Sequence, residues 1–312
     1  MKEAIINSQI MRCFRYFGYI LFVLILYFVV KILYSNLLQV QWSQLSVSYY
    51  FVALAFLFEI LSKCFLGVSY YFFLSLYGFF VPFKRSVWAG WCIALGKYIP
   101  GKMGVFIGSV YILNRNGVNK ITAGIIPFFI TLFTLFFASF LSVPVWISIS
   151  NSPFLFQFNW HYYLVFLFVG TLMLAPAMGK LFYSFHENFR KMPPINDPAN
   201  LPILFVHWAV FFQVLCSGIA TWMMLRAVYH MSPSSLFLLV SLNAFSLVMG
   251  SITFFVPAGL GIRDGAFFIG LTHVIPVEIA ALSVVLIRIL QILSDIITGG
   301  FAFVCLKKDR LL

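Results

Sequence analysis

Long runs of apolar residues constrain the fold of this chain more than any other feature of its sequence. Spanning the hydrocarbon core of a bilayer, about 30 Å thick, takes about 20 apolar helical residues. Because lipid offers the backbone no hydrogen-bond partners, such runs must form helices rather than open strands. We predict an all-α polytopic membrane protein with six full spans, at residues 16–34, 48–78, 121–147, 161–182, 201–229 and 277–306.

The composition agrees with this class. Of the 312 residues, 62% are hydrophobic and only 9% are charged, which leaves too few polar groups to cover a soluble surface. The 20 Lys and Arg against 8 acids would suggest nucleic acid in a soluble protein, but the cations lie at the ends of apolar runs. They fit membrane topology signals and anionic lipid head groups, so no nucleic-acid partner is expected.

Two further apolar regions, 86–113 and 235–275, are interrupted near their middles by proline, glycine and charge. The interruptions read LGKYIPGKMG, from residue 95, and FFVPAGLGIRDG, from residue 254. Each half is expected to be too short to span a bilayer. A pair of half-helices meeting at a break is typical of a re-entrant hairpin, whose irregular backbone is buried in protein or lines a wet cavity.

The positions of the basic residues predict the orientation. If six runs span and both interrupted regions are re-entrant, the cationic groups near residues 2–15, 84–120, 180–191 and 307–310 all lie on one side. This places both termini in the cytoplasm, with an uncleaved first span. Residues 1–312 then form a single membrane domain whose halves, 1–156 and 157–312, are an inverted repeat.

Broken helices in corresponding positions of inverted halves indicate a midplane substrate site. At the first break the candidate binding residues are Lys97, Pro100, Gly101, Lys102 and Gly104. Proline ends the preceding helix and glycine permits turns that a side chain would forbid, so the tip exposes backbone donors and two cations. That combination suits a phosphate, although two ordinary interfacial lysines would give the same pattern.

At the second break the candidate binding residues are Pro257, Gly259, Gly261, Arg263 and Asp264. The planar guanidinium of Arg263 could hold a phosphate through two hydrogen bonds. Asp264 would orient Arg263 or carry a proton. The alternative is a local Arg/Asp pair that only stabilises the turn.

Four charged residues inside predicted spans are possible supporting residues. Glu59 and Lys63 are spaced i,i+4 and are expected to neutralise each other, in a structural role rather than a relay. Arg288 and Asp295 lie on one helix face, roughly 10 Å apart along the axis, so each needs a partner from another helix or from water. This face should therefore point into the bundle.

Other chemistry has little support in the sequence. The five cysteines and five histidines are scattered without ligand spacing, so we expect neither a metal nor a cofactor. No arrangement of nucleophile, acid and base stands out, so an enzyme acting on lipids is not expected.

At its two breaks the sequence resembles the lysylphosphatidylglycerol synthase transmembrane region, also called the flippase-like domain family. Members typically have a basic residue before a Pro-Gly turn in the first half and a P-x-G-x-G-x-R-E-like turn in the second. Two departures are Lys97, where arginine is common, and Asp264, where glutamate is common. The resemblance implies an inner-membrane protein that translocates lipids or lipid-linked intermediates. Larger members add a soluble domain that attaches lysine to phosphatidylglycerol, and such transfer is not expected here because the chain ends shortly after its last span.

The sequence thus predicts a flippase-like transporter of an anionic phospholipid or a lipid-linked intermediate, with membrane lipids as its partners. The alternative is a non-transporting scaffold or partner subunit of an enzyme that makes an envelope lipid or polysaccharide. The oligomeric state does not follow from the sequence.

Overall fold

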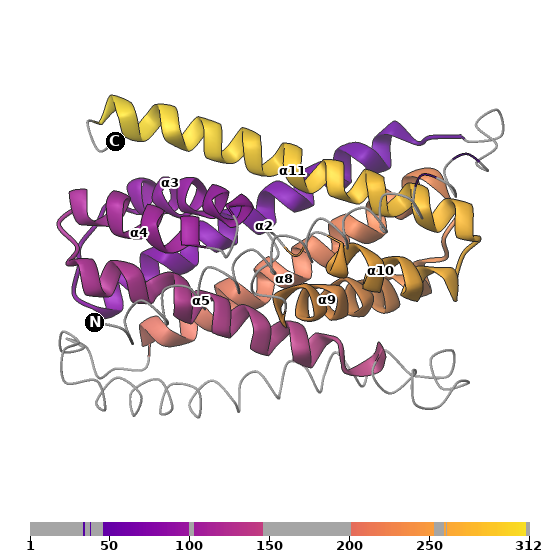
Figure 1. Ribbon diagram of the computed structural model, residues 1–312, viewed down its shortest axis with the longest axis horizontal. Coiled ribbons are helices and arrows are strands. Elements are labelled where there is room, and N and C mark those ends of the chain that lie inside the picture. The colour runs from indigo at the N-terminus through magenta and orange to yellow at the C-terminus, as the bar shows by residue number, and fades with distance from the viewer. Residues whose placement is uncertain are drawn as a thin grey trace, which may run out of the picture.

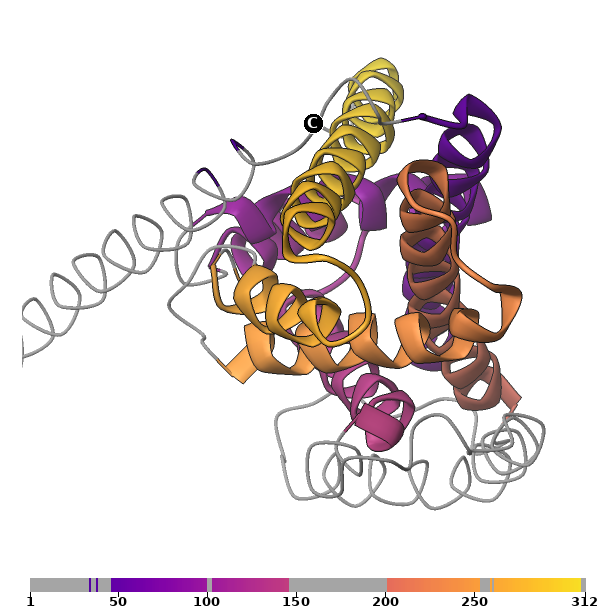
Figure 2. The same ribbon diagram turned by 90° about the vertical axis from the view of Figure 1, so that its right-hand side faces the viewer.

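A computed structural model describes residues 46–99, 103–145, 201–252, 259 and 261–309, together with residues 34 and 38. Within these residues the secondary structure is helical and contains no strand. The longest helices are α2 (Tyr49–Leu76), α8 (Leu201–Val228) and α11 (Val277–Lys308), and with α5 (Lys120–Leu141) they run along the long axis of the molecule (Figure 1). α2 packs along α8, and α11 contacts both. The end-on view shows these helices around a common centre (Figure 2).

Five helical segments in the described residues are long and apolar enough to cross a membrane: α2, α5, α8, α11 and the segment Pro233–Ile252. The first four confirm apolar helices at the predicted spans 48–78, 121–147, 201–229 and 277–306. The predicted spans 16–34 and 161–182 lie outside the described residues. The protein is therefore a multi-pass helical membrane protein.

The first interrupted region forms two helices that pack on each other. These are α3 (Phe83–Ala94), extended by a 3-10 turn η2 (Leu95–Tyr98), and α4 (Met103–Arg115). A side chain on Gly96 would overlap the backbone of Gly104, so the two glycines allow the close approach of η2 and α4. The break thus lets the chain fold back tightly on itself.

The second interrupted region has the same helix, break and helix order. It contains the 3-10 turn η5 (Pro233–Ser235), α9 (Leu236–Ile252) and α10 (Ile262–Thr272), and α9 packs against α10. Gly261, directly before α10, has φ of 87°, a left-handed conformation that favours glycine. Together η5 and α9 are long enough to cross a membrane. The prediction that each half is too short to span is therefore wrong for this half.

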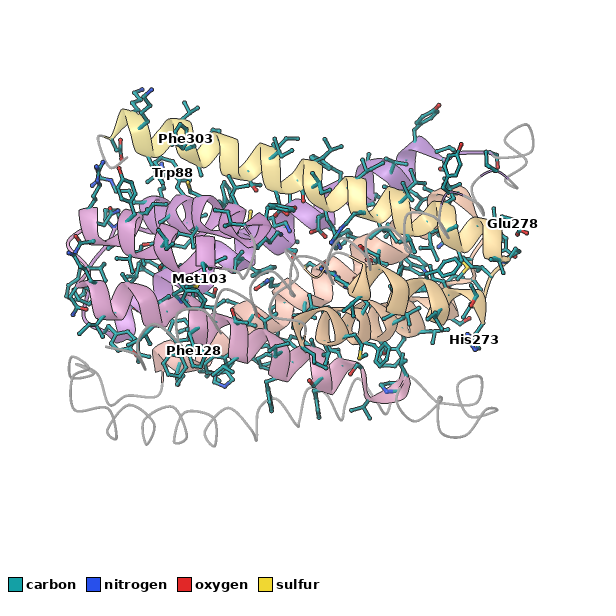
Figure 3. The ribbon with its side chains drawn as sticks, viewed as in Figure 1. Trp88, Met103, Phe128, His273, Glu278 and Phe303 are labelled. Carbon is teal, nitrogen blue, oxygen red and sulfur yellow. The ribbon has the colours of Figure 1, made fainter. Side chains whose placement is uncertain are left out.

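The two helix pairs lie at opposite ends of the bundle (Figure 1). Trp88 of α3 packs against Phe301 near the end of α11, with ring centres 6.3 Å apart, whereas α10 leads through residues 273–276 into the beginning of α11. Figure 3 shows Trp88 and Phe303 towards one end of the long axis, and His273 and Glu278 towards the other. The helix ends next to both breaks, at Tyr98 and at Arg263, lie towards the middle of the molecule.

Phenylalanines fill the space between α2, α5 and α8. The ring centres of Phe73 and Phe133 are 5.8 Å apart, as are those of Phe137 and Phe211. All four side chains are buried. This apolar packing fixes the long helices around the polar region described next.

Candidate functional site

A cavity of about 210 Å³ lies beside the middle turns of α2, α8 and α11. A 28-residue helix such as α2 is about 42 Å long, so these turns are far from either end of the bundle. Lys97 and Tyr98 reach the cavity from the first break, and Arg263 reaches it from the second. The two breaks therefore contribute to one site.

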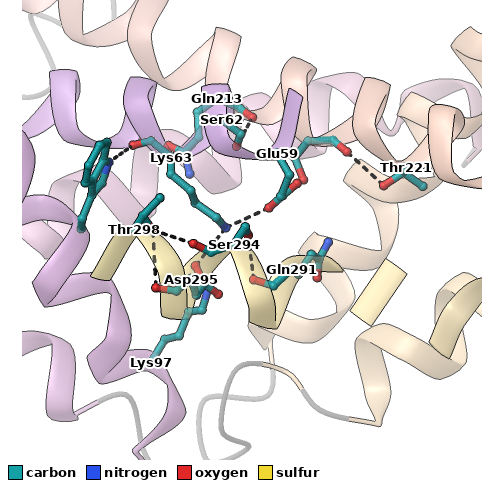
Figure 4. A network of polar contacts seen from close by, with 12 residues as sticks. Glu59, Ser62, Lys63, Lys97, Gln213, Thr221, Gln291, Ser294, Asp295 and Thr298 are labelled. Atoms are coloured by element: carbon teal, nitrogen blue, oxygen red, sulfur yellow. Dashed lines mark hydrogen bonds and ion pairs between the residues drawn. The ribbon is translucent and has the colours of Figure 1, made fainter. Parts of the chain in front are cut away.

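The carboxylate of Asp295, on α11, is the centre of a buried polar network (Figure 4). Its Oδ1 lies 3.1 Å from the Nζ of Lys63, and its Oδ2 lies 2.5 Å from the Nζ of Lys97. The Tyr98 hydroxyl also donates to Oδ2, at 2.6 Å. Only 2% of the Asp295 side chain is exposed. A single buried carboxylate thus connects α11 with α2 and with the tip of the first helix pair.

Lys63 also contacts a second carboxylate. Its Nζ lies 2.9 Å from Glu59 on the same helix, as the i,i+4 spacing predicts. The predicted pair is therefore confirmed, but it is not isolated, because the same ammonium also contacts Asp295. The indole N–H of Trp91, on α3, donates to the carbonyl of Lys63 at 2.7 Å and fixes the backbone of this turn.

The second break contributes a different pairing from the one expected. Asp264 lies 3.6 Å from Arg288 on α11 and accepts a hydrogen bond from the Gly261 N–H at 3.1 Å, so it caps α10. Contrary to the sequence expectation, Asp264 pairs with Arg288 and not with its neighbour Arg263. The Nη2 of Arg263 instead donates to Oδ1 of Asn243, on α9, at 3.2 Å.

The prediction about Arg288 and Asp295 is confirmed. Each has an oppositely charged partner on another element, Asp264 for Arg288 and two lysines for Asp295. Both side chains are largely buried, so this face of α11 does point into the bundle.

The charges around the cavity do not cancel. Four cations, Lys63, Lys97, Arg263 and Arg288, lie with three carboxylates, Glu59, Asp264 and Asp295. With every group ionised, one positive charge is left over among the described residues. Arg263 has a neutral partner, and no carboxylate in the described part of the chain lies within 4 Å of it. Because an uncompensated charge is unfavourable away from water, the cavity is suited to an anion.

The candidate binding residues fall into three groups. Lys97 and Arg263 line the cavity. Asp264 contacts Arg288, which also lines it. Gly104 packs against Gly96, while Gly259 and Gly261 adopt positive φ, so these glycines shape the two breaks rather than line the cavity. Pro100, Gly101, Lys102 and Pro257 lie outside the described residues.

Sequence reasoning missed the neutral polar side chains of the cavity. Tyr98 lies inside the first break but bears no charge, and Gln213, Asn243 and Gln291 are single amides within apolar helices. The available signal was the position of these amides near the middle of a membrane-length helix, where polar groups are rare and often functional.

No protein-family model matches this sequence, and no curated protein matches it significantly. The resemblance to the lysylphosphatidylglycerol synthase transmembrane region stays a prediction based on the residues of the two breaks. The fold and the site define a multi-pass helical membrane protein with a charged cavity among its long helices.

Proposed function

We propose that this protein is a flippase-like transporter that moves an anionic phospholipid or a lipid-linked intermediate between the two leaflets. One observation carries the proposal: residues of both breaks line a single cavity at mid-height of the long helices, where cations outnumber carboxylates. Ionisable side chains at membrane depth commonly mark a substrate path. Broken helices that meet near the midplane are a recurring feature of transporters.

The size of the cavity fits a head group and not a whole lipid. Pockets for drug-sized ligands are about 300–1,000 Å³, and this cavity measures about 210 Å³. The head group would enter the cavity while the acyl chains stay in the bilayer. Binding and movement require no covalent step, so the proposal involves no enzyme activity.

The membrane arrangement predicted from the sequence belongs to the same proposal. Both helix pairs would be re-entrant, entering from opposite faces, and the halves 1–156 and 157–312 would form an inverted repeat in the inner membrane with both termini in the cytoplasm. The position of the two helix pairs at opposite ends of the bundle supports this arrangement (Figure 1). Rocking of one half against the other would then open the cavity to each leaflet in turn.

The test is leaflet exchange in proteoliposomes with an acyl-labelled phosphatidylglycerol, measured by quenching the label exposed on the outer leaflet. The change is Arg263→Gln, which removes the cation that has no carboxylate partner among the described residues. Because a hydrogen bond to a charged group contributes about 1.5–3 kcal/mol, we expect exchange to fall by about tenfold to a hundredfold.

The matched control is Arg226→Gln. The guanidinium of Arg226 stacks 4.8 Å from the ring centre of Phe51 and 5.1 Å from that of Trp222, and it does not line the cavity. We expect this variant to exchange lipid at the wild-type rate. If wild-type vesicles match empty ones for phosphatidylglycerol and for lipid-linked intermediates, and a stable enzyme co-purifies, a scaffold replaces the transporter as the better proposal.

A further inference from the structure

We infer that the head group accepted by this cavity is a phosphate ester of a neutral polyol or sugar and carries no ammonium group. This inference rests on the proposed transport function and narrows its substrate class. Three properties of the cavity support it: its carboxylates are all engaged, one of its cations is available, and part of its lining is neutral and able to hydrogen bond.

The three carboxylates already have cationic partners inside the protein. Glu59 pairs with Lys63, Asp295 with Lys63 and Lys97, and Asp264 with Arg288. An ammonium on the ligand would have to take a carboxylate from one of these cations and leave that cation uncompensated in a buried site. Breaking a buried pair in this way is strongly unfavourable. The cavity therefore disfavours zwitterionic and cationic head groups.

Arg263 is the group available to a phosphate. A guanidinium has five N–H donors, and within the described ranges Arg263 makes one side-chain hydrogen bond, to the amide oxygen of Asn243. Arginine binds phosphate through two parallel hydrogen bonds, which a neutral amide partner does not prevent. Because Arg263 lines the cavity, a phosphate there would be held by the unbalanced positive charge.

Another part of the lining consists of neutral groups from α5 and α8. The side-chain oxygen of Gln213 is buried and has no hydrogen-bond donor among the described residues, and Gln213 lines the cavity. The hydroxyl of Thr134, which also lines the cavity, donates to the carbonyl of Ile130, and its oxygen can still accept a hydrogen bond. A buried acceptor without a donor is unfavourable, and a ligand hydroxyl would satisfy it without adding charge.

The volume agrees with this composition. A cavity of about 210 Å³ holds several water molecules and is smaller than the pockets of about 300–1,000 Å³ that take drug-sized ligands, which suits a phosphate with a small polyol. The phosphate would contact Arg263, and the polyol would contact Gln213.

The test compares three lipids with the same labelled acyl chains in the proteoliposome assay. Phosphatidylglycerol offers a phosphate and hydroxyls, phosphatidic acid a phosphate without a polyol, and phosphatidylethanolamine a phosphate with an ammonium. We expect phosphatidylglycerol to exchange fastest, phosphatidic acid several-fold more slowly, and phosphatidylethanolamine at least tenfold more slowly than phosphatidylglycerol.

The discriminating variant is Gln213→Leu, which should lower phosphatidylglycerol exchange to the rate of phosphatidic acid and leave the latter unchanged. The control is Thr221→Val on the same helix, where the hydroxyl bonds to the carbonyl of Ser217 and does not line the cavity. We expect it to keep the wild-type preference. Thermal stabilisation of the detergent-solubilised wild type by the same three lipids should follow the same order, and this measurement needs no substitution.

The outcomes separate this inference from the proposed function. Equal exchange of phosphatidylethanolamine and phosphatidylglycerol, or a preference that Gln213→Leu leaves intact, overturns the inference while transport stands. If the folded protein exchanges none of the three lipids, the proposed function fails for glycerophospholipids. The order of thermal stabilisation then decides the head-group inference by itself.

Discussion

Replacing Asp295 with asparagine removes one negative charge from the buried network and changes the side-chain volume little. In the wild type this carboxylate lies 2.5 Å from Lys97 and 3.1 Å from Lys63. After the change Lys63 keeps Glu59, but Lys97 loses the one carboxylate that lies within 4 Å of it in the described part of the chain. The substitution therefore isolates the cost of leaving one lysine unpaired.

The expected loss follows from the burial of the two partners. Removing one member of a buried pair costs about 3–5 kcal/mol, because the other charge is left uncompensated. The Lys97 side chain is 33% exposed, so its ammonium keeps some hydration. We therefore expect the free energy of unfolding to fall by an amount near the lower bound, about 3 kcal/mol. For a large domain this corresponds to a melting temperature about 6 °C lower. Tryptophan fluorescence during heating in detergent measures it.

A matched acid on the same helix gives the control. Asp309, at the end of α11, lies 2.9 Å from Arg85, but 31% of Asp309 and 41% of Arg85 are exposed. An exposed pair contributes at most about 1 kcal/mol, so Asp309→Asn should lower the melting temperature by about 2 °C or less.

A double variant tests the cause. When Lys97→Met is combined with Asp295→Asn, both charges of the pair are removed, and the combined loss should be about 1–3 kcal/mol smaller than the sum of the two single losses. Equal effects of Asp295→Asn and Asp309→Asn, or single losses that simply add, would refute the argument that a buried ion pair holds these elements together.

Two further predictions concern the first helix pair, both measured by the same thermal unfolding. Gly96→Ala places a side chain against the backbone of Gly104 and should cost about 1–3 kcal/mol, whereas Gly108→Ala, where nothing lies within 4 Å, should be neutral or gain up to about 1 kcal/mol from helix propensity. Equal changes in stability for Gly96→Ala and Gly108→Ala would contradict the close approach of η2 and α4. Trp91→Phe removes the hydrogen bond to the Lys63 carbonyl and should cost about 1 kcal/mol, and an unchanged melting temperature would mean that this bond adds nothing.

The sequence predicted the long helices well because the length of an apolar run is a local property. The span predicted at 201–229 is observed as Leu201–Val228, and the one predicted at 277–306 as Val277–Lys308. The breaks were also found, since proline and glycine act on the nearby backbone. The first half of the second interrupted region was misjudged because its helical segment begins at Pro233, before the predicted start at 235, and runs for 20 residues to Ile252.

The pairing of charges could not be predicted in the same way. Lys63 and Asp295 are far apart in the chain, and only the packing of α2 against α11 brings them together. Asp264 was assigned to its sequence neighbour, although the orientation of α10 directs it to Arg288. Gln213 was overlooked because a single uncharged amide barely alters the hydropathy of a long apolar helix. Which charged groups pair, and which amides line the cavity, depends on the tertiary packing of the helices, and local sequence patterns do not contain that information.

The sharing of one carboxylate by two lysines restricts how this protein can change over evolution. A mutation that removes Asp295 leaves Lys97 without its partner, whereas loss of Lys97 first still leaves Asp295 with Lys63 and Tyr98. The order of the two mutations therefore matters, and the route through loss of the lysine is the more accessible one. Homologous chains that lack the acid should accordingly lack the lysine as well, while the reverse need not hold.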